Sequence, residues 1–143
     1  ENKELTLLIK NESNQLESKL DDKFNELELQ SINSEKLLLL EVFDLTGGNS
    51  SWLDTSLWNV DTELSEWLNV KIDNSDSQHV IEVSLGENGL TGTLPKQFFE
   101  LKYLTELQLH RNNLEGEIPL SIGQLTLLRV LYLNDNKLTG SIP

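Results

Sequence analysis

Hydrophobic and polar residues follow the same order three times between residues 80 and 143. The three segments are residues 80–95, 104–119 and 128–143, so the repeat spacing is 24 residues. Each segment carries an apolar–polar–apolar triplet, at residues 83–85, 107–109 and 131–133. This alternation predicts a short strand with one buried face. Because one such coil cannot bury its own apolar edge, the coils are expected to stack.

Asparagine, glycine and proline also recur at fixed places in the three segments. The asparagines are Asn88, Asn112 and Asn136, and we expect their amides to bond backbone groups of the neighbouring coil. A glycine and a proline follow in each segment, which allows one bend and restrains the next. The pattern therefore predicts a stack of similar coils. One departure is Phe99, which stands where the second segment has Gly123 and is expected to alter the bend or to pack sideways.

The N-terminal part of the chain has the period of a helix. Apolar residues fall on one stripe over residues 3–30, with polar and acidic residues elsewhere: Leu5, Ile9, Leu16, Leu20, Phe24 and Leu27. Neither heptad register stays apolar, so a long coiled coil is only one alternative. We expect the stripe to pack on the neighbouring domain or on a sister chain; the alternatives are a dedicated oligomerising stalk and a helix on a membrane surface. The acid-rich polar face argues against the membrane.

A second helix is predicted from Glu35 to about Leu45, ended by the glycines of residues 46–49. Three tryptophans follow: Trp52, Trp58 and Trp67. We expect them to form a hydrophobic core, and the alternative is a platform on which a carbohydrate stacks. Residues 73–77 are rich in turn formers and predict a loop before the first repeat strand.

The repeat pattern L-x-x-L-x-L-x-x-N-x-L-x-G-x-I-P, over residues 80–143, resembles plant-type leucine-rich repeats (LRRs). These occur in receptor-kinase ectodomains and in inhibitors of cell-wall hydrolases. The resemblance implies an α/β solenoid: a right-handed LRR superhelix with a parallel sheet on its concave side and a second, shorter strand near the glycine. An α-helical cap and a long amphipathic helix would precede it.

The order of the second helix, Thr46, two glycines and three tryptophans resembles the N-terminal cap of such proteins. In that family two cysteines usually bracket the last tryptophan and form a disulfide. The matching positions here are Ser65 and Ile72. The resemblance therefore implies a cap without a bridge, which must depend on buried tryptophan and leucine area.

These patterns divide the chain into three predicted parts. Residues 1–33 form an amphipathic acidic helix, 34–78 a helical cap that contains the tryptophans, and 79–143 the repeats. Two repeats are complete and one is partial, so we expect the array to continue beyond residue 143 and the sequence to be part of a longer protein.

Composition and charge narrow the functions that fit. The net charge of −13 argues against nucleic acid and anionic membrane partners. Residues 1–78 carry 17 acidic and 6 basic side chains, whereas residues 79–143 carry 7 and 5, so the repeats are nearly neutral. The chain has no cysteine, two histidines and no known catalytic or phosphate-binding motif. We therefore expect neither an enzyme nor a metal or cofactor site, and no segment that inserts into a membrane.

The outward positions of the strands are the candidate ligand-binding residues. The register selects nine of them: Glu82, Ser84, Glu106, Gln108, His110, Arg111, Arg129, Tyr132 and Asn134. Tyrosine, arginine and histidine are able to make directional contacts at interfaces. The alternative for each residue is an ordinary solvated side chain, with the ligand bound on later repeats.

Two functional hypotheses follow. The first is a non-catalytic recognition module that binds a protein, peptide or glycan on the concave face. The second is an assembly or adhesion component in which residues 3–30 join copies into a homo-oligomer. The family resemblance favours an extracellular or cell-surface setting, while the missing cap disulfide keeps a cytoplasmic scaffold as the alternative.

Overall fold

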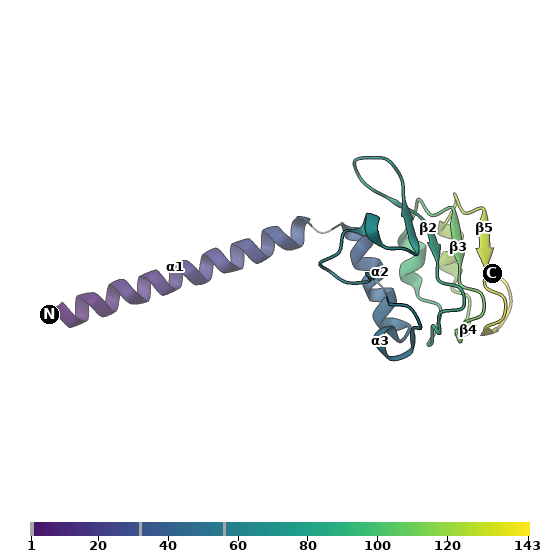
Figure 1. The fold of residues 1–143 in the computed structure, drawn as a ribbon, viewed down its shortest axis with the longest axis horizontal. Helices are drawn as coiled ribbons and strands as arrows, with labels where there is room; N and C mark the ends of the chain where they lie inside the picture. The colour runs from purple at the N-terminus through teal and green to yellow at the C-terminus, as the bar shows by residue number, and fades with distance from the viewer. Residues whose placement is uncertain (1, 32, 56) are drawn as a thin grey trace. The chain divides into compact units, whose positions relative to one another are not determined.

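The computed structural model describes residues 2–31, 33–55 and 57–143, with side chains omitted for residues 25–31. Contacts divide the chain into two units, residues 1–33 and 34–143. The first unit is a single helix, α1 (Asn2–Ser31), as the period of its apolar residues predicted (Figure 1). Among the described residues, no helix has both the length and the apolar character needed to cross a membrane.

The second unit starts with the cap. Helix α2 (Ser34–Leu45) is followed by the short helix α3 (Gly48–Ser51), a 3-10 turn (Leu64–Glu66) and strand β1 (Val70–Ile72). Gly47 between the helices has φ +102°, the left-handed conformation that ends α2. Strand β1 pairs antiparallel with the first repeat strand, and no strand was predicted there from the sequence. The cap thus covers the first edge of the repeat sheet.

The predicted tryptophan core of the cap is confirmed. Trp52, Trp58 and Trp67 are 6%, 4% and 1% exposed, which rules out a carbohydrate platform. The ring centroids of Trp58 and Trp67 lie 4.5 Å apart, and those of Trp52 and Trp58 lie 4.8 Å apart. The edge of Phe43 from α2 adds a T-shaped contact with Trp52. The resemblance implied a cap without a disulfide, and packed aromatic rings form the core of this cap instead.

The repeat strands form the parallel arrangement that the 24-residue spacing predicted (Figure 1). Strands β2 (Val80–Ser84), β3 (Glu106–Gln108) and β5 (Val130–Tyr132) follow β1 in the order β1-β2-β3-β5. Val83 is in register with Leu107, and Leu107 with Leu131. The second, shorter strands, β4 (Glu115–Glu117) and β6 (Lys137–Thr139), also pair in parallel near the glycines.

Inward leucines build the core of the repeats. Leu85 and Leu109 are 1% and 0% exposed, and Leu107 is fully buried. In the third coil Leu133 is partly buried but Leu131 is 37% exposed, because β5 is the last strand of the sheet and no further coil covers it here. The prediction of inward leucines is therefore confirmed most fully for the two inner coils.

The predicted asparagine ladder is present as well. The Oδ1 of Asn112 accepts hydrogen bonds from the backbone N–H groups of Asn88 and Leu90, each at 3.0 Å. Its Nδ2 donates to the carbonyls of Leu85 at 2.9 Å and Leu109 at 3.0 Å. These bonds satisfy backbone groups that the bend removes from sheet pairing.

Of the two end rungs of the ladder, one repeats the middle rung and the other does not. Asn136 repeats the pattern, accepting from Leu114 N–H at 3.0 Å and donating to the carbonyl of Leu109 at 2.9 Å. Asn88 instead bonds Asp54, whose N–H donates to its Oδ1 at 2.7 Å. The first rung therefore joins the repeats to the cap.

The bends after Pro95 and Pro119 are 3-10 helices, at Lys96–Glu100 and Leu120–Gln124. Phe99 and Gly123 occupy the same place in these turns, yet the backbone continues almost identically, with φ and ψ of −80° and 76° at Leu101 and −81° and 71° at Leu125. Phe99 does not alter the bend. It is fully buried, in the turn that packs against α2, so it packs sideways into the core.

Candidate functional site

The solvent-facing side of β2, β3 and β5, here called the open face, carries the candidate residues in rows. Glu82 pairs with Glu106, which pairs with Val130 on its other side. Ser84, Gln108 and Tyr132 form a second row in the same way. Each row takes one residue from each coil because the register shift is one full repeat. Regular stacking therefore brings residues 24 positions apart into neighbouring places.

A further row continues the face beyond the strand ends. Gly86, His110 and Asn134 occupy it, since the N–H of Glu87 donates to the His110 carbonyl at 2.9 Å and the N–H of Arg111 donates to the Asn134 carbonyl at 2.9 Å. The following residues, Glu87, Arg111 and Asp135, all have positive φ, at 55°, 53° and 58°. The left-handed turn is thus repeated in every coil without glycine.

Four of the nine candidate residues come together. His110, Arg111, Tyr132 and Asn134 line an open hollow of about 380 Å³ on this face. Tyr132 is 50% exposed and its ring meets the His110 ring edge-on, with centroids 6.0 Å apart. An exposed aromatic surface beside a guanidinium and an amide is suited to directional binding.

The other five candidates lie on or next to the open face but do not line the hollow: Glu82, Ser84, Glu106, Gln108 and Arg129. The carboxylate of Glu82 pairs with Lys71 of β1 at 3.4 Å. Arg129 precedes β5, and its backbone N–H donates to the Thr105 carbonyl at 2.8 Å. These residues extend the surface around the hollow.

His110 is less exposed than its outward position suggested, because a glycine lies beside it. A Cβ added to Gly86 would come within 2.3 to 2.8 Å of three atoms of the His110 ring. The imidazole therefore occupies the space that a side chain at position 86 would need. Its Nδ1 is buried, and no hydrogen-bond partner for it occurs among the described residues. The glycine at position 86, in the row of His110, is the sequence signal for this placement.

Arg111 is held by two carboxylates. Its Nη1 donates to Glu87 Oε1 at 2.7 Å, and its Nε lies 3.6 Å from Asp135 Oδ2. The hydrogen bond and charge of Glu87, and then the charge of Asp135, raise the pKa of the guanidinium above its ordinary value. A ligand anion would have to compete with both acids for this charge.

The ion-pair ladder of Glu87, Arg111 and Asp135 was not predicted from the sequence. The sequence places an acid, a base and an acid at one position of successive repeats: Glu87, Arg111 and Asp135. Alternating charge at the repeat spacing was the available signal, since side chains one repeat apart are neighbours in a parallel sheet. The nine candidates included Arg111 alone.

A second cluster joins the cap to the repeats. Glu35 of α2 accepts a hydrogen bond from the N–H of Val80 at 3.0 Å, and its Oε2 lies 3.4 Å from His79 Nδ1. The His79 ring stacks on Tyr103 with centroids 3.7 Å apart. Because these residues come from α2, the start of β2 and the loop before β3, the cluster fixes the cap to the first two coils.

The chemistry of catalysis does not assemble at the open face. Among the residues described in 2–31, 33–55 and 57–143, no group of three or more His, Cys, Asp or Glu side chains could hold a metal ion. The hollow offers one imidazole and one guanidinium that is already paired with two carboxylates, on an open surface. It is suited to contact rather than to proton transfer in a closed site.

Comparison with known proteins agrees with the repeats seen here. A family model described as leucine rich repeat matches residues 78–138. The repeat region is similar to this family over the matched residues, which make up less than half of the chain. The matched segment contains β2, β3, the hollow and the asparagine ladder. No curated protein sequence matches the chain.

Solved structures of plant proteins have a similar fold. The ectodomain of BIR2 from Arabidopsis thaliana superposes with a TM-score of 0.66 at 26% identity, over 79% of this chain and 60% of that one. The Arabidopsis receptor kinase HAESA, in complex with the peptide hormone IDA and the co-receptor SERK1, gives 0.66 at 28% identity, over 78% and 19%. A plant ice-binding protein gives 0.57 at 26% identity, over 78% and 43%.

The chain spans less than two thirds of the length of each of these structures. The likeness therefore extends to only part of each of these proteins. No enzyme family is indicated by these matches.

Proposed function

We propose that this LRR chain is a non-catalytic recognition module whose open face binds a protein or peptide. The observation that carries the proposal is the hollow lined by His110, Arg111, Tyr132 and Asn134. It combines an exposed tyrosine with polar groups that a rigid, stacked sheet holds in place. Preorganised aromatic anchors contribute most to binding because they lose little conformational freedom.

The solved neighbours support this class of ligand. HAESA is seen with a peptide hormone and a co-receptor, and PEPR1, with a TM-score of 0.61, is seen with AtPEP1. BIR3 is seen in a complex with SERK2, at a TM-score of 0.60. A peptide or protein is thus better supported than a glycan, which stays the weaker alternative for the same face.

The wider setting is part of the same proposal. We take the array to continue as a right-handed solenoid with the open face on its concave side, and the parts 1–33, 34–78 and 79–143 to be its helix, cap and repeats. The neighbours are receptor ectodomains, which supports an extracellular or cell-surface location. A cytoplasmic scaffold is the alternative, because the cap has no cysteines.

The experiment uses a random peptide library displayed on phage and selected against the chain of residues 1–143. Selected peptides are then measured on Tyr132→Ala, on Arg111→Glu/Tyr132→Ala and on Tyr103→Ala. Tyr103 is the matched control, since it is 46% exposed but lies outside the hollow. We expect at least a tenfold loss for both Tyr132 variants and none for Tyr103→Ala. Selected peptides that bind all four proteins equally would overturn the proposal.

We also propose a separate assembly role for α1. Its stripe residues Leu5, Ile9, Leu16 and Leu20 are all at least 60% exposed, which leaves an apolar face that a partner can cover. Sedimentation of the chain over a range of concentrations tests this role, and a monomer at all of them would contradict it.

A further inference from the structure

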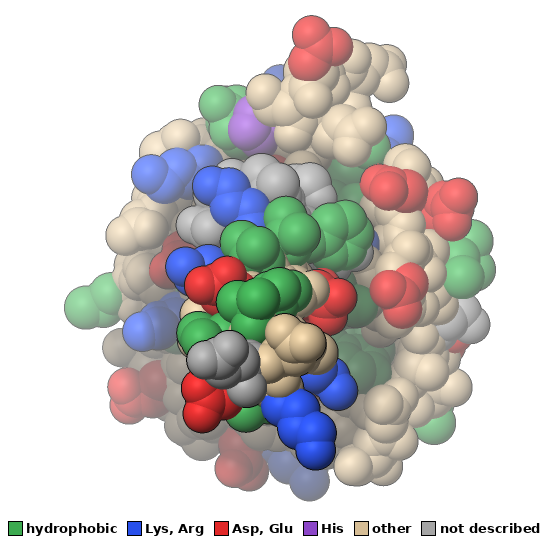
Figure 2. All heavy atoms as spheres, turned by 90° about the vertical axis from the view of Figure 1, so that its left-hand side faces the viewer, with side chains coloured by type: hydrophobic (Ala, Val, Ile, Leu, Met, Phe, Trp, Pro, Cys, Tyr) green, Lys and Arg blue, Asp and Glu red, His purple; other side chains and the backbone are tan. Residues whose placement is uncertain are grey.

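The apolar stripe of α1 has no cover among the described residues. Leu5, Ile9, Leu16, Leu20 and Phe24 are 60% to 68% exposed. In the space-filling view, hydrophobic side chains lie on the exterior beside acidic and basic ones (Figure 2). A helix of this kind obtains most of its stability by packing its apolar face. Leu27 continues the stripe in the sequence, although its side chain lies outside the described residues.

The spacing of the stripe is 11 residues rather than 7. Leu5 and Leu16 are 11 apart, as are Ile9 and Leu20, and Ser13 and Phe24. Eleven residues make three turns of 3.67 residues, so the stripe runs almost straight along α1 and suits a nearly straight or slightly right-handed pair of helices. This period explains why neither heptad register stays apolar.

We propose that the stripe of α1 pairs with α1 of a second copy of this chain, in antiparallel orientation. In such a pair the sequence numbers of any two facing residues add to the same total. A sum of 29 fills every layer of the described stripe, since Leu5 faces Phe24, Ile9 faces Leu20 and Ser13 faces Leu16 of the second copy. The arrangement is symmetric, so each contact occurs twice.

The charges beside the stripe select this orientation. In an antiparallel pair, residues beside the apolar layers face residues about two positions above or below on the second copy. The sequence numbers of two such residues therefore add to 27 or 31. Lys10 then meets Glu17 on one flank, and Glu12 meets Lys19 on the other. Both pairs are attractive. In a parallel pair, a flanking residue faces the residue five positions further along, so Glu12 would face Glu17 with the same charge.

The size of the face is sufficient for a reversible dimer. A buried leucine removes on the order of 100 Å² from water. Ten side chains exposed by about 60% therefore supply roughly 600 Å², and the aliphatic stems of the flanking lysines and glutamates bring the pair toward the ~1,000 Å² of a specific interface. The cap is a poor substitute partner, because residues 34–78 carry 9 acidic and 2 basic residues and α1 is itself acidic.

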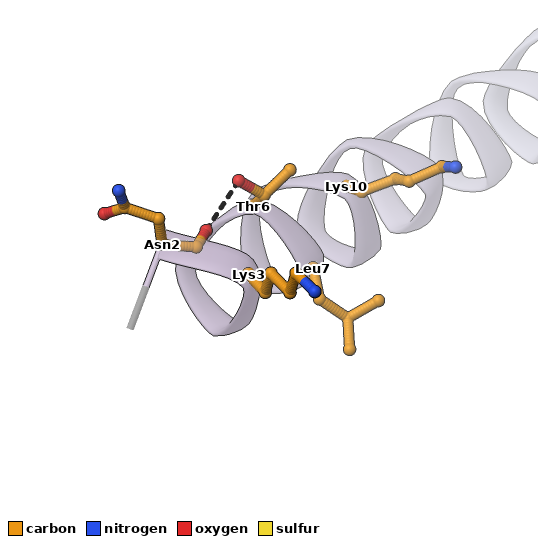
Figure 3. A pocket seen from close by; sticks show the side chains of 5 residues that line it. All are labelled: Asn2, Lys3, Thr6, Leu7 and Lys10. Atoms are coloured by element: carbon orange, nitrogen blue, oxygen red, sulfur yellow. Dashed lines mark hydrogen bonds between the residues drawn. The ribbon is translucent and has the colours of Figure 1, made fainter.

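A second surface of α1 shares only Lys10 with the proposed pair. A hollow of about 330 Å³ near its N-terminus is lined by Asn2, Lys3, Thr6, Leu7 and Lys10 (Figure 3). All its walls come from one helix, and the Thr6 hydroxyl donates to the Asn2 carbonyl at 2.7 Å within it. It is a furrow between side chains rather than a site for a ligand.

Antiparallel pairing presupposes the assembly role proposed for α1, and the first experiment separates the two. Sedimentation equilibrium compares the chain of residues 1–143 with Glu12→Lys, with Glu12→Lys/Lys19→Glu and with Asp22→Lys. Asp22 is the matched control, because it lies on the side of α1 away from the stripe. Glu12→Lys should weaken the dimer roughly tenfold, the exchanged pair should restore it, and Asp22→Lys should leave it unchanged.

The results have distinct meanings. The weakest dimer of interest has a dissociation constant of roughly 100 µM. If the wild-type chain is a monomer at about that concentration, both the pairing and the assembly role are overturned. A dimer that Glu12→Lys strengthens would overturn the antiparallel arrangement and leave assembly standing, since this change relieves the Glu12–Glu17 repulsion of a parallel pair.

Cross-linking tests the register directly, because the chain has no native cysteine. In the antiparallel pair the two copies of residue 9 are about 16 Å apart along the axis, at 1.5 Å per residue, too far for a disulfide. We expect Ile9→Cys and Leu20→Cys to form no covalent dimer alone and to link to each other when mixed and oxidised. Efficient linking of Ile9→Cys to itself would overturn the proposed orientation.

Discussion

Replacing Asn112 by alanine tests how far the asparagine ladder stabilises the stacked coils. The side chain is 6% exposed, and its amide satisfies the N–H groups of Asn88 and Leu90 and the carbonyl of Leu85. The carbonyl of Leu109 keeps a second donor, from Asn136. The substitution therefore leaves three buried backbone groups without their partner.

The magnitude follows from these three groups. Each unsatisfied buried group costs about 1–3 kcal/mol, and water that enters the vacated space recovers part of this. We expect Asn112→Ala to lower the free energy of unfolding by about 3–5 kcal/mol, a large share of the 5–15 kcal/mol typical of a domain.

The assay is urea unfolding followed by tryptophan fluorescence, because Trp52, Trp58 and Trp67 are all buried in the cap of the same unit. Asn113→Ala is the matched control. Asn113 is exposed, and only its backbone N–H bonds the neighbouring coil, at 2.8 Å from the Leu90 carbonyl. Its replacement should change stability by less than about 0.5 kcal/mol. If Asn112→Ala lost no more than this control, the ladder would not hold the coils together.

Three further predictions concern the cap, the glycine bend and acid stability. Trp67→Ala should lower the free energy of unfolding by about 3–5 kcal/mol. Trp67→Phe should cost much less, because the buried Nε1 of Trp67 has no hydrogen-bond partner among the described residues, and urea unfolding compares the two variants. Gly92→Ala should cost about 1–3 kcal/mol, because φ is +80° and a Cβ would lie 2.9 Å from the Leu45 carbonyl. Gly123→Ala, with nothing within 4 Å, should be nearly neutral in the same assay. The Ser75 hydroxyl and the N–H groups of Ser75 and His79 lower the pKa of Asp73 below 3.8. The stability that the Asp73 carboxylate contributes is therefore present above that pH and lost below it. The difference in unfolding free energy between wild type and Asp73→Asn should shrink from pH 5 to pH 3.

The sequence predicted the repeats accurately because they are periodic. Val83, Leu107 and Leu131 share a column in the sequence and are paired in the sheet, since one repeat of 24 residues is one step of the register. Helix α1 was predicted over residues 3–30 and spans Asn2–Ser31 for the same reason. Periodicity fixes which residues are neighbours.

Features without a period were harder to predict. Strand β1 has only three residues, and it forms because β2 offers it an edge. The placement of His110 depends on the absence of a side chain at Gly86. The pairing of the Arg111 guanidinium depends on Glu87 and Asp135 in the neighbouring coils. The last two features depend on neighbours one repeat away, so a residue considered in its own coil does not reveal them. The open face is set by such neighbours.

Amide hydrogen exchange, resolved by residue, tests the stacking of the coils most directly. The N–H groups of Asn88, Leu90 and Leu114 bond asparagine side chains of the next coil, and those of Leu85 and Leu109 bond its backbone. Stacked coils predict that all five exchange slowly, with exchange free energies near that of global unfolding. Exchange as fast as that of the exposed loop at residues 74–77 would contradict the stacking, and with it the open face.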